Sequence, residues 1–412
     1  MKGGDSMESE YKVKIPFDWK ERERWLDLPV PLQEYRERVQ KLQRIMKTNN
    51  IHCMIVYGGP SGTSNLQYIC GYDSWWGDTM VYIPPDGDDL IFVTNAVFHG
   101  EPAHSNMHTH WIKDIRSVLH PHSAEKPKSI ADLITEIVKG KGYATGSIAV
   151  CDDKKIPYHL MKQLEHLLPS ANVVPGAPHL QKLRRHKSPF EVALLRKACE
   201  CADAGLNKAI DHLRLGITER ESHTIIAREA YAKGAHHFMA SVLFGPRSSM
   251  KNVFVPSEYE LKEGEMVNMD VYCKVAGYGS DTHRNAMIGK PKDDLSLRLM
   301  DVAWNAGNKV LEKMGPGVII HDLQKIMFDY IEKAGLLEYD FTTVLFAHGC
   351  GLDLVEEPYF FWGNKAKLEP GMTFYLEPCL VKHGLGTACT ENLILITGNG
   401  YEVLSKAREK NW

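Results

Sequence analysis

The spacing of apolar residues predicts helices and strands that alternate along the first part of the chain. Between Pro31 and Asn50, apolar side chains recur every three or four residues, which is the period of a helix with one buried face. The apolar run Cys53–Tyr57 follows and predicts a buried strand. The β-rich runs Thr79–Ile83 and Leu90–Val93 flank the turn-forming sequence Pro84–Asp88, and this order predicts a hairpin.

Helical spacing returns at residues 129–140 and 155–168, on either side of a short apolar strand at 147–151. Strands that alternate with helices are typical of an α/β domain, and we assign residues 31–180 to one such domain. The polar residues 1–30 are expected to form an arm that packs on the body of the protein.

A second domain is expected at residues 181–412 and begins with strong helix signals. Ser188 can cap a helix, and Glu191 can complete a capping box with it. Apolar residues then recur at spacings of three and four from Val192 to Leu213, which predicts a helix with one buried face. The sequence Thr218-Glu-Arg-Glu221 predicts a second helix that begins with the same kind of box.

An internal repeat organises this second domain. Residues 261–270 align without gaps to residues 368–377, and each segment has a glycine in fourth place, a β-rich run and a carboxylate in tenth place. With one further carboxylate after each segment, the acidic positions are Asp270 and Asp281 in the first copy and Glu377 and Glu391 in the second. Two half-sites that face each other across a pseudo-twofold axis would bring these carboxylates together, which is costly unless cations neutralise them.

One histidine completes a set of candidate metal ligands. His348 lies in the sequence Phe346-Ala-His348-Gly-Cys-Gly351, where the glycines allow close approach of the backbone. Carboxylate oxygens hold divalent cations and can bridge two of them, while a neutral imidazole favours Mn, Fe, Co or Zn over Ca or Mg. The pattern therefore predicts a metal site built from both copies of the repeat.

Composition and charge exclude several classes of function. The chain has 412 residues, of which 43% are hydrophobic and 25% charged, as in ordinary globular proteins. A net charge of −3 gives no electrostatic basis for binding nucleic acid or an anionic membrane. No run approaches the roughly 20 apolar residues that span a bilayer, and the polar start lacks the apolar core of a secretory signal. The nine cysteines form no C-x-x-C pair, so we expect reduced thiols in a cytoplasmic protein.

The motifs of the chain resemble those of the creatinase, prolidase and aminopeptidase P superfamily. The matching pieces are Lys187-Ser-Pro-Phe-Glu191, Asp270-x10-Asp281, His348-Gly-Cys-Gly-Leu-Asp353, Pro370-Gly-Met-Thr-Phe-Tyr-Leu-Glu377-Pro378, Thr390-Glu391 and Asn65-Leu-Gln-Tyr68-Ile-Cys-Gly71-Tyr72. The resemblance implies an α/β fold class, with a small N-terminal creatinase-type α/β domain. It also implies a C-terminal α+β pita-bread domain with an internal pseudo-twofold repeat, and a homodimer.

The resemblance also implies a mechanism. The ligands of two divalent metal ions (Mn, Fe, Co or Zn) would be Asp270, Asp281, His348, Glu377 and Glu391. Asp281 and Glu391 would bridge the ions, a metal-bound hydroxide would be the nucleophile, and Glu377 could also take a proton. The implied activity is hydrolysis of a C–N bond in a small substrate, either an Xaa-Pro dipeptide or a zwitterionic amide.

The chain departs from the peptidases of this superfamily at three places. Those enzymes carry a histidine seven residues after the ligand histidine, where this chain has Val355, and another in the region that corresponds to Gly245–Pro256, which contains none. An arginine normally precedes the last glutamate by two residues, and here that residue is Cys389. The histidines stabilise the tetrahedral intermediate and help to protonate the leaving amine.

Two alternatives to an ordinary peptidase therefore stay open. One is a metal-dependent lyase that acts on a small sulfonium or betaine-type carboxylate, in the manner of a dimethylsulfoniopropionate lyase. The other is a non-enzymatic binding module built on the same scaffold.

Other residues could replace the missing histidines or hold the substrate. His283 and Tyr272 each stand two residues after a carboxylate of the first copy, and on a strand they would share its face, so both are catalytic candidates. The adjacent residues Trp75 and Trp76 stand beside acidic residues in the sequence, and their rings suit a cationic substrate group through cation–π contact. The candidates for substrate binding are Tyr72, Trp75, Trp76, His237, Asp353 and Glu356.

Overall fold

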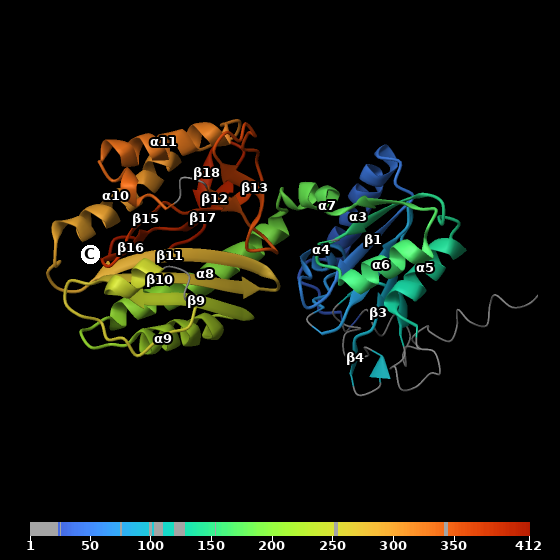
Figure 1. Cartoon of the computed structure of the whole chain (residues 1–412), viewed down its shortest axis with the longest axis horizontal. Coiled ribbons are helices and arrows are strands. Elements are labelled where there is room, and N and C mark those ends of the chain that lie inside the picture. The colour runs from blue at the N-terminus through green and yellow to red at the C-terminus, as the bar shows by residue number, and fades with distance from the viewer. Residues whose placement is uncertain are drawn as a thin grey trace, which may run out of the picture. The chain divides into compact units, whose positions relative to one another are not determined.

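The chain folds into two compact units, Met1–Arg184 and Arg185–Trp412 (Figure 1). The computed structural model describes residues 24, 26–74, 76–98, 101–102, 110–118, 128–152, 154–250, 254–341 and 345–412. Most of the arm expected at residues 1–30 lies outside the described residues. The domain boundary expected after residue 180 falls inside helix α7 (Ala177–Arg184), which belongs to the first unit.

A six-stranded mixed sheet forms the centre of the first unit. Its order is β6-β3-β2-β1-β7-β8, and a short pair of strands, β4 and β5, lies outside it. The strands are β1 (Cys53–Gly58), β2 (Thr79–Ile83), β3 (Ile91–Thr94), β4 (Val97–Phe98), β5 (Glu101–Pro102), β6 (Asp114–Ser117), β7 (Ser147–Cys151) and β8 (Asn172–Pro175). The helices are α3 (Leu32–Thr48), α4 (Ser64–Cys70), α5 (Ile130–Gly140), α6 (Tyr158–Leu167) and α7.

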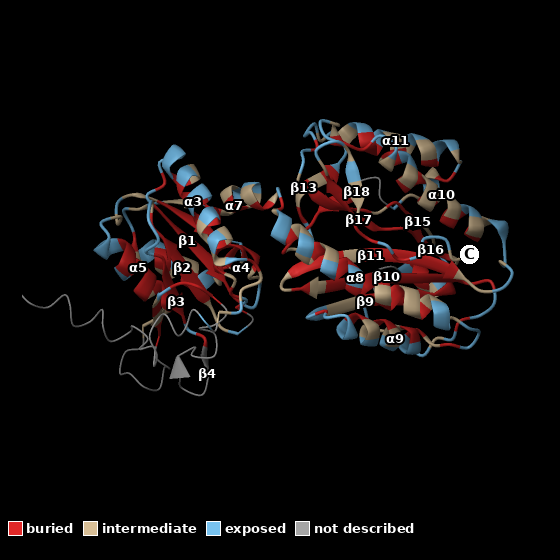
Figure 2. Cartoon of the chain, turned by 180° about the vertical axis from the view of Figure 1, so that it is seen from behind, coloured by how far each residue is buried: buried red, intermediate tan, exposed pale blue. Residues whose placement is uncertain are grey.

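The sequence signals of the first unit match its elements closely. Strands β2 and β3 pair antiparallel, which confirms the predicted hairpin, and β1 pairs with β7 in parallel. Every residue of β1 and β2 is buried, as expected for central strands with side chains packed on both faces of a sheet (Figure 2). Helix α5 begins with a full capping box between Ser129 and Asp132.

In the second unit the order of elements repeats. The first copy contains α8 (Pro189–His212), α9 (Glu219–Ala232), β9 (His237–Phe244), η2 (Gly245–Met250), β10 (Met266–Val275) and β11 (Tyr278–Met287). The second copy begins with α10 (Asp294–Leu311), α11 (Ile320–Lys333), η3 (Leu337–Tyr339), β12 (Leu345–Gly349) and β13 (Glu356–Phe361). It continues with β14 (Thr373–Leu376), β15 (Cys379–Lys382), β16 (Gly386–Cys389), β17 (Asn392–Ile396) and β18 (Tyr401–Val403). Each copy is thus a pair of helices followed by strands.

The strands of the two copies lie between the two pairs of helices. The first copy forms the sheet β11-β10-β9, and the second forms the sheet β13-β12-β14-β17-β18 with the separate ribbon β15-β16. Helices α8 and α9 lie outside one layer of strands, and α10 and α11 lie outside the other (Figure 1). A β-bridge between His283 and Glu391 joins the two layers. Residues from both copies of the repeat therefore meet at the middle of the unit.

The helix starts of the second unit test the capping predictions. Ser188 accepts a hydrogen bond from the Glu191 backbone, and the Glu191 carboxylate accepts one from the Ser188 backbone, so the first box is confirmed. Thr218 caps α9, but the side chain of Glu221 pairs with Arg214 at 2.6 Å, so the second box forms only in part. Among the described helices, none has the length and apolar character that crossing a lipid bilayer requires.

Candidate metal centre

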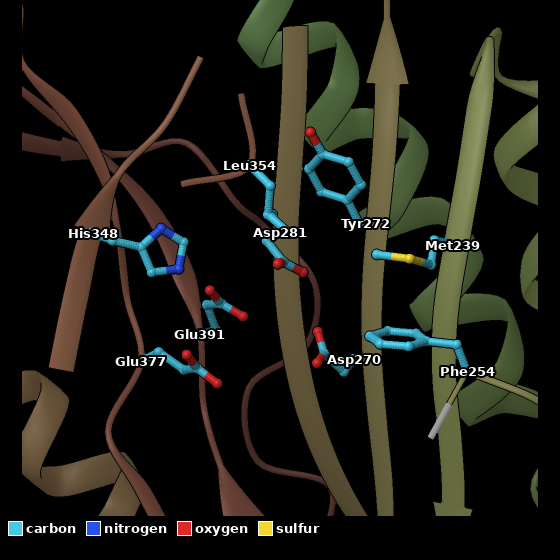
Figure 3. A pocket seen from close by; sticks show the side chains of 9 residues that line it. All are labelled: Met239, Phe254, Asp270, Tyr272, Asp281, His348, Leu354, Glu377 and Glu391. Atoms are coloured by element: carbon cyan, nitrogen blue, oxygen red, sulfur yellow. The ribbon is translucent and has the colours of Figure 1, made fainter. Parts of the chain in front are cut away.

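A pocket of about 320 Å³ lies among the strands of the second unit. It is lined by Met239, Phe254, Asp270, Tyr272, Asp281, His348, Leu354, Glu377 and Glu391 (Figure 3). The structure thus brings together the five residues that the sequence proposes as metal ligands. Their side chains come from both layers of strands and point toward a common space (Figure 3). The volume is within the range of about 300–1,000 Å³ that is typical of ligand pockets.

The register of three strands places the residues of the first copy. Tyr272 on β10 lies opposite Asp281 on β11 and Met239 on β9. Two residues away, Asp270 lies opposite His283. Because side chains two residues apart point to the same face of a strand, these two rows lie side by side on one face of the sheet. His283 thus shares the face of Asp281, as predicted from their spacing.

Backbone contacts between segments place the residues of the second copy. His348 lies in β12, and Glu377 directly follows β14 and donates its backbone N–H to the Phe346 carbonyl at 3.0 Å. Glu391, between β16 and β17, donates its backbone N–H to the His283 carbonyl at 3.1 Å. The two copies of the repeat are therefore held together directly beside the candidate ligands.

A buried arginine supports this junction. The guanidinium of Arg284 donates to the carbonyls of His283 at 2.9 Å and Glu391 at 2.8 Å, and to the side chain of Asn392 at 2.7 Å. It also donates twice to the carbonyl of Ala407. Burial lowers the pKa of the Arg284 guanidinium, because the charged form loses its contact with water. These bonds hold in place the backbones of His283 and of the pocket residue Glu391.

The surroundings of His348 bear on which of its ring nitrogens could bind a cation. Its Nδ1 atom lies 3.3 Å from the Gly349 carbonyl, and its ring packs edge-on against Tyr375 with centroids 5.3 Å apart. A carbonyl at this distance favours the tautomer in which Nδ1–H donates, which leaves the lone pair of Nε2 for a cation.

Donor atoms gather in three overlapping groups. Each residue of a group contributes one ligand atom, and these atoms lie within 4.8 Å of one another. The groups are His348 with Glu377 and Glu391, Asp270 with His283 and Glu391, and His283 with Glu377 and Cys389. Glu391 belongs to the first two groups, so its carboxylate stands where it could bridge two ions. Carboxylates together with imidazole suit divalent Mn, Fe, Co or Zn, and the donor set therefore fits the predicted cofactors.

Tyr272 offers a hydrogen-bond donor at the same pocket. Its hydroxyl is buried and has no hydrogen-bond partner among the described residues. Burial raises the pKa of the Tyr272 hydroxyl well above its ordinary value, and the negative charge of Asp281 raises it further. The hydroxyl therefore keeps its proton at neutral pH and can donate it in a hydrogen bond to a bound molecule.

The residues proposed for substrate binding in the first unit differ in how far they are exposed. Tyr72 is only 3% exposed, and its ring packs against Phe92 and His110. This burial leaves the Tyr72 ring without an open face for a substrate cation, contrary to the expectation from sequence. Trp76 is 53% exposed, whereas Trp75 lies outside the described residues.

The remaining candidates in the second unit do not line the pocket. His237 is exposed at the start of β9, and the carbonyl of Asp353 accepts a hydrogen bond from the Gly351 backbone. Glu356 is buried and forms an ion pair with Lys187 at 2.6 Å. That pairing gives Glu356 a structural role in place of the cation or substrate contact expected from sequence.

The apolar residues that line the pocket were not predicted from the sequence. Met239, Phe254 and Leu354 line it together with the charged residues. The alternation of side chains along β9 could have pointed to Met239, because the register places it in the row of Tyr272 and Asp281. Phe254 and Leu354 lie in loops, where no periodicity indicates which side chains face a pocket.

Comparison with known proteins places these features in a family. Residues 193–398 match the model of metallopeptidase family M24, and residues 38–186 match the creatinase/prolidase N-terminal domain. An uncharacterised peptidase of Staphylococcus saprophyticus is 32% identical over 228 residues, 55% of this chain and 64% of that protein. This chain thus spans just under two thirds of the length of that relative.

Two further relatives extend over most of the chain. An Xaa-Pro dipeptidase of Pyrococcus horikoshii is 24% identical over 379 residues, which are 91% of this chain and 98% of that protein. The crystal structure of a recombinant prolidase from Thermococcus sibiricus superposes with a TM-score of 0.79 at 22% identity, over 91% of this chain and 98% of that one. These likenesses confirm the predicted fold class, a creatinase-type N-terminal domain followed by a pita-bread domain.

Proposed function

The chain belongs to metallopeptidase family M24, and from this premise we propose that it is a dinuclear metal-dependent hydrolase that cleaves a C–N bond in a small substrate. The observation that carries the proposal is the convergence of four carboxylates and one imidazole on a single pocket. Carboxylates in such proximity repel one another strongly unless cations neutralise them.

Two divalent ions would be held by Asp270, Asp281, His348, Glu377 and Glu391. Such ions supply two things to hydrolysis: they lower the pKa of a bound water and they polarise the scissile carbonyl. The position of Glu391 in two donor groups supports its proposed role as a bridge between the ions. Glu377 faces the same space and is our candidate for the group that accepts a proton from the attacking water.

We propose that Tyr272 does part of the work of the histidines that are absent at Val355 and in Gly245–Pro256. Tyr272 keeps its hydroxyl proton and lines the pocket, on the same strand as Asp270 and opposite Asp281. A donor in this place can stabilise the oxyanion that forms as the scissile carbonyl is attacked. Val355 is 45% exposed and does not line the pocket, so it supplies no replacement itself.

The lining of the pocket supports a substrate with both polar and apolar parts. The lining combines the candidate ligands with the apolar side chains of Met239, Phe254 and Leu354. An Xaa-Pro dipeptide or a zwitterionic amide with an aliphatic ring has this division, and the pocket volume of about 320 Å³ suits a molecule of that size.

Elemental analysis of the purified protein tests the metal centre. We expect about two Mn, Fe, Co or Zn ions per wild-type chain and a loss of metal in Glu377→Ala. The matched control is Glu369→Ala, because Glu369 is a glutamate eight residues earlier whose carboxylate pairs with His186 at the surface. Failure of the wild-type protein to retain any of these metals would contradict the proposal.

A substrate screen tests the reaction. The metal-loaded protein is incubated with Xaa-Pro dipeptides, zwitterionic amides and a sulfonium carboxylate, and products are followed by mass spectrometry. Hydrolysis of a C–N bond supports the proposal. Release of a sulfide without addition of water would establish the lyase alternative, which the two absent histidines favour. Metal binding without turnover of any of these substrates would favour the binding module.

A further inference from the structure

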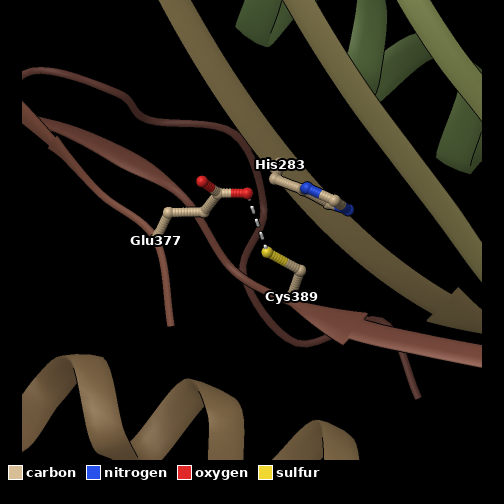
Figure 4. Close-up of side chains that lie close together, drawn as sticks. All are labelled: His283, Glu377 and Cys389. Atoms are coloured by element: carbon tan, nitrogen blue, oxygen red, sulfur yellow. Dashed lines mark hydrogen bonds between the residues drawn. The ribbon is translucent and has the colours of Figure 1, made fainter. Parts of the chain in front are cut away.

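A cysteine, a histidine and a glutamate converge beside the pocket from three separate segments (Figure 4). Cys389 ends β16, His283 lies in β11, and Glu377 follows β14. One ligand atom from each lies within 4.8 Å of the others. Cys389 is the only cysteine that joins such a donor group in the described part of the chain.

Two hydrogen bonds determine the position of Cys389. Its backbone N–H donates to Oδ1 of Asn285 at 2.6 Å, and its thiol donates to Oε1 of Glu377 at 3.5 Å (Figure 4). A buried cysteine that serves only for packing behaves as a small apolar side chain. Cys389 is fully buried, yet its sulfur is directed at a carboxylate that is itself a candidate metal ligand.

His283 connects this group to the rest of the centre. Its Nδ1 atom lies 3.9 Å from Oδ2 of Asp270, and it shares a second donor group with Asp270 and Glu391. The imidazole is fully buried and belongs to both groups. Donor atoms near His283 therefore include both carboxylate oxygens and a thiol.

Asn268 can determine which nitrogen of His283 faces a cation. The side-chain amide of Asn268 lies 2.5 Å from Nε2 of His283, and its Oδ1 atom is buried without a hydrogen-bond partner among the described residues. The two orientations of an amide are nearly indistinguishable by shape. With Oδ1 turned to the ring, Nε2–H donates to it and the lone pair of Nδ1 becomes available, as is usual for histidines that bind metals.

We propose that Cys389 and His283 are additional ligands of the metal centre, so that one ion has sulfur, nitrogen and oxygen donors and the centre selects zinc over manganese. The inference rests on the proposed function, because it presupposes that the centre binds metal. On binding, the S–H bond of Cys389 breaks, the proton goes to solvent and the sulfur lone pair forms a bond to the ion. No atom is oxidised or reduced. Thiolate and imidazole ligands favour zinc, whereas oxygen ligands alone suit manganese.

Cobalt substitution tests the sulfur ligand directly. Thiolate bound to Co²⁺ gives an intense charge-transfer absorption in the near ultraviolet, which oxygen and nitrogen ligands do not give. We expect this absorption in the wild-type protein loaded with cobalt, and its loss in Cys389→Ser. The matched control is Cys350→Ser. Burial raises the pKa of the Cys350 thiol to about 12, and this thiol contacts Thr373 outside the donor groups.

Competition between metals gives a second measurement. In Cys389→Ser, the ratio of zinc affinity to manganese affinity should fall by about tenfold or more, the scale on which changes around metal ligands act. If this variant does not fold, the cobalt spectrum of the wild-type protein still tests for a sulfur ligand, because the absorption itself requires a thiolate.

The outcomes separate the two proposals. Two cobalt ions per chain with no charge-transfer absorption would overturn the sulfur ligand and leave the hydrolase proposal intact. An absorption that persists in Cys389→Ser would also overturn the assignment. Failure of the wild-type protein to bind cobalt or zinc at all would instead refute the metal centre on which both proposals depend.

Discussion

Replacement of Glu377 by glutamine should make the metal-free protein more stable than the metal-free wild type. With metal bound, the same variant should be less stable than the wild type. Glu377→Gln keeps the shape of the side chain and removes its negative charge. The carboxylate of Glu377 shares its pocket with those of Asp270, Asp281 and Glu391. In the absence of cations these charges repel one another, so the loss of one should raise the free energy of unfolding.

The distances in the centre set the size of this effect. Glu377 and Glu391 belong to a donor group whose ligand atoms lie within 4.8 Å of one another. At that separation two unit charges repel by about 1 kcal/mol in water and by about 3 kcal/mol at an effective dielectric constant of about 20. We therefore expect metal-free Glu377→Gln to be more stable than the wild type by about 1–3 kcal/mol.

Metal should reverse the order of stability. A ligand at 100 times its dissociation constant adds about 2.7 kcal/mol per site to the free energy of unfolding, or about 5 kcal/mol for two sites. The wild-type protein should gain this amount, whereas Glu377→Gln should gain much less because it has lost a ligand. When zinc or manganese is added, the wild-type protein should therefore become more stable to unfolding than Glu377→Gln.

Urea unfolding monitored by tryptophan fluorescence, once with a chelator and once with metal in excess, measures both effects. Glu369→Gln is the control, because its carboxylate lies at the surface and should change neither value. A metal-free Glu377→Gln protein that is less stable than the wild type would refute the reasoning about charge repulsion. An equal gain from metal in both proteins would refute Glu377 as a ligand.

Three further predictions follow from individual contacts. Tyr272→Phe should lower kcat by about 10²- to 10³-fold, the effect of losing one oxyanion donor, while elemental analysis shows unchanged metal content; an unchanged kcat would exclude that role. Lys187→Met leaves the charge of Glu356 buried without its partner at 2.6 Å, so urea unfolding should show a loss of about 3–5 kcal/mol. The double variant Lys187→Met/Glu356→Leu should recover most of that loss, and no recovery would contradict an ion-pair origin. Ser188→Ala removes the N-cap of α8 and should cost about 1 kcal/mol in the same assay, whereas a cost near zero would show that the cap is dispensable.

Signals that act over a few residues were sufficient to predict much of the fold. The helix at Leu32–Thr48, the strand at Cys53–Gly58 and the hairpin of β2 and β3 all follow from apolar spacing and turn residues. The capping box of Ser188 and Glu191 forms as expected. Each of these depends on backbone geometry within one element or one turn, which the local sequence controls.

Contacts between distant segments were harder to predict. The pairing of Lys187 with Glu356 joins residues far apart in the chain, and it gives Glu356 a partner that no local pattern indicates. The burial of Tyr72 depends in the same way on Phe92 and His110, which other segments bring to it. The residues next to Tyr72 and Glu356 in the sequence do not reveal these partners, so sequence alone assigned both residues to substrate binding.

The sequence by itself determined which residues could form a metal centre, because the repeat places carboxylates at matching positions of two β-rich segments. The tertiary structure decided how they meet, through the register of β10 with β11 and the bridge between His283 and Glu391. It also brought Cys389 to Glu377 and His283. Proximity of this kind depends on how separate strands are aligned and packed, and that alignment is set by the whole core.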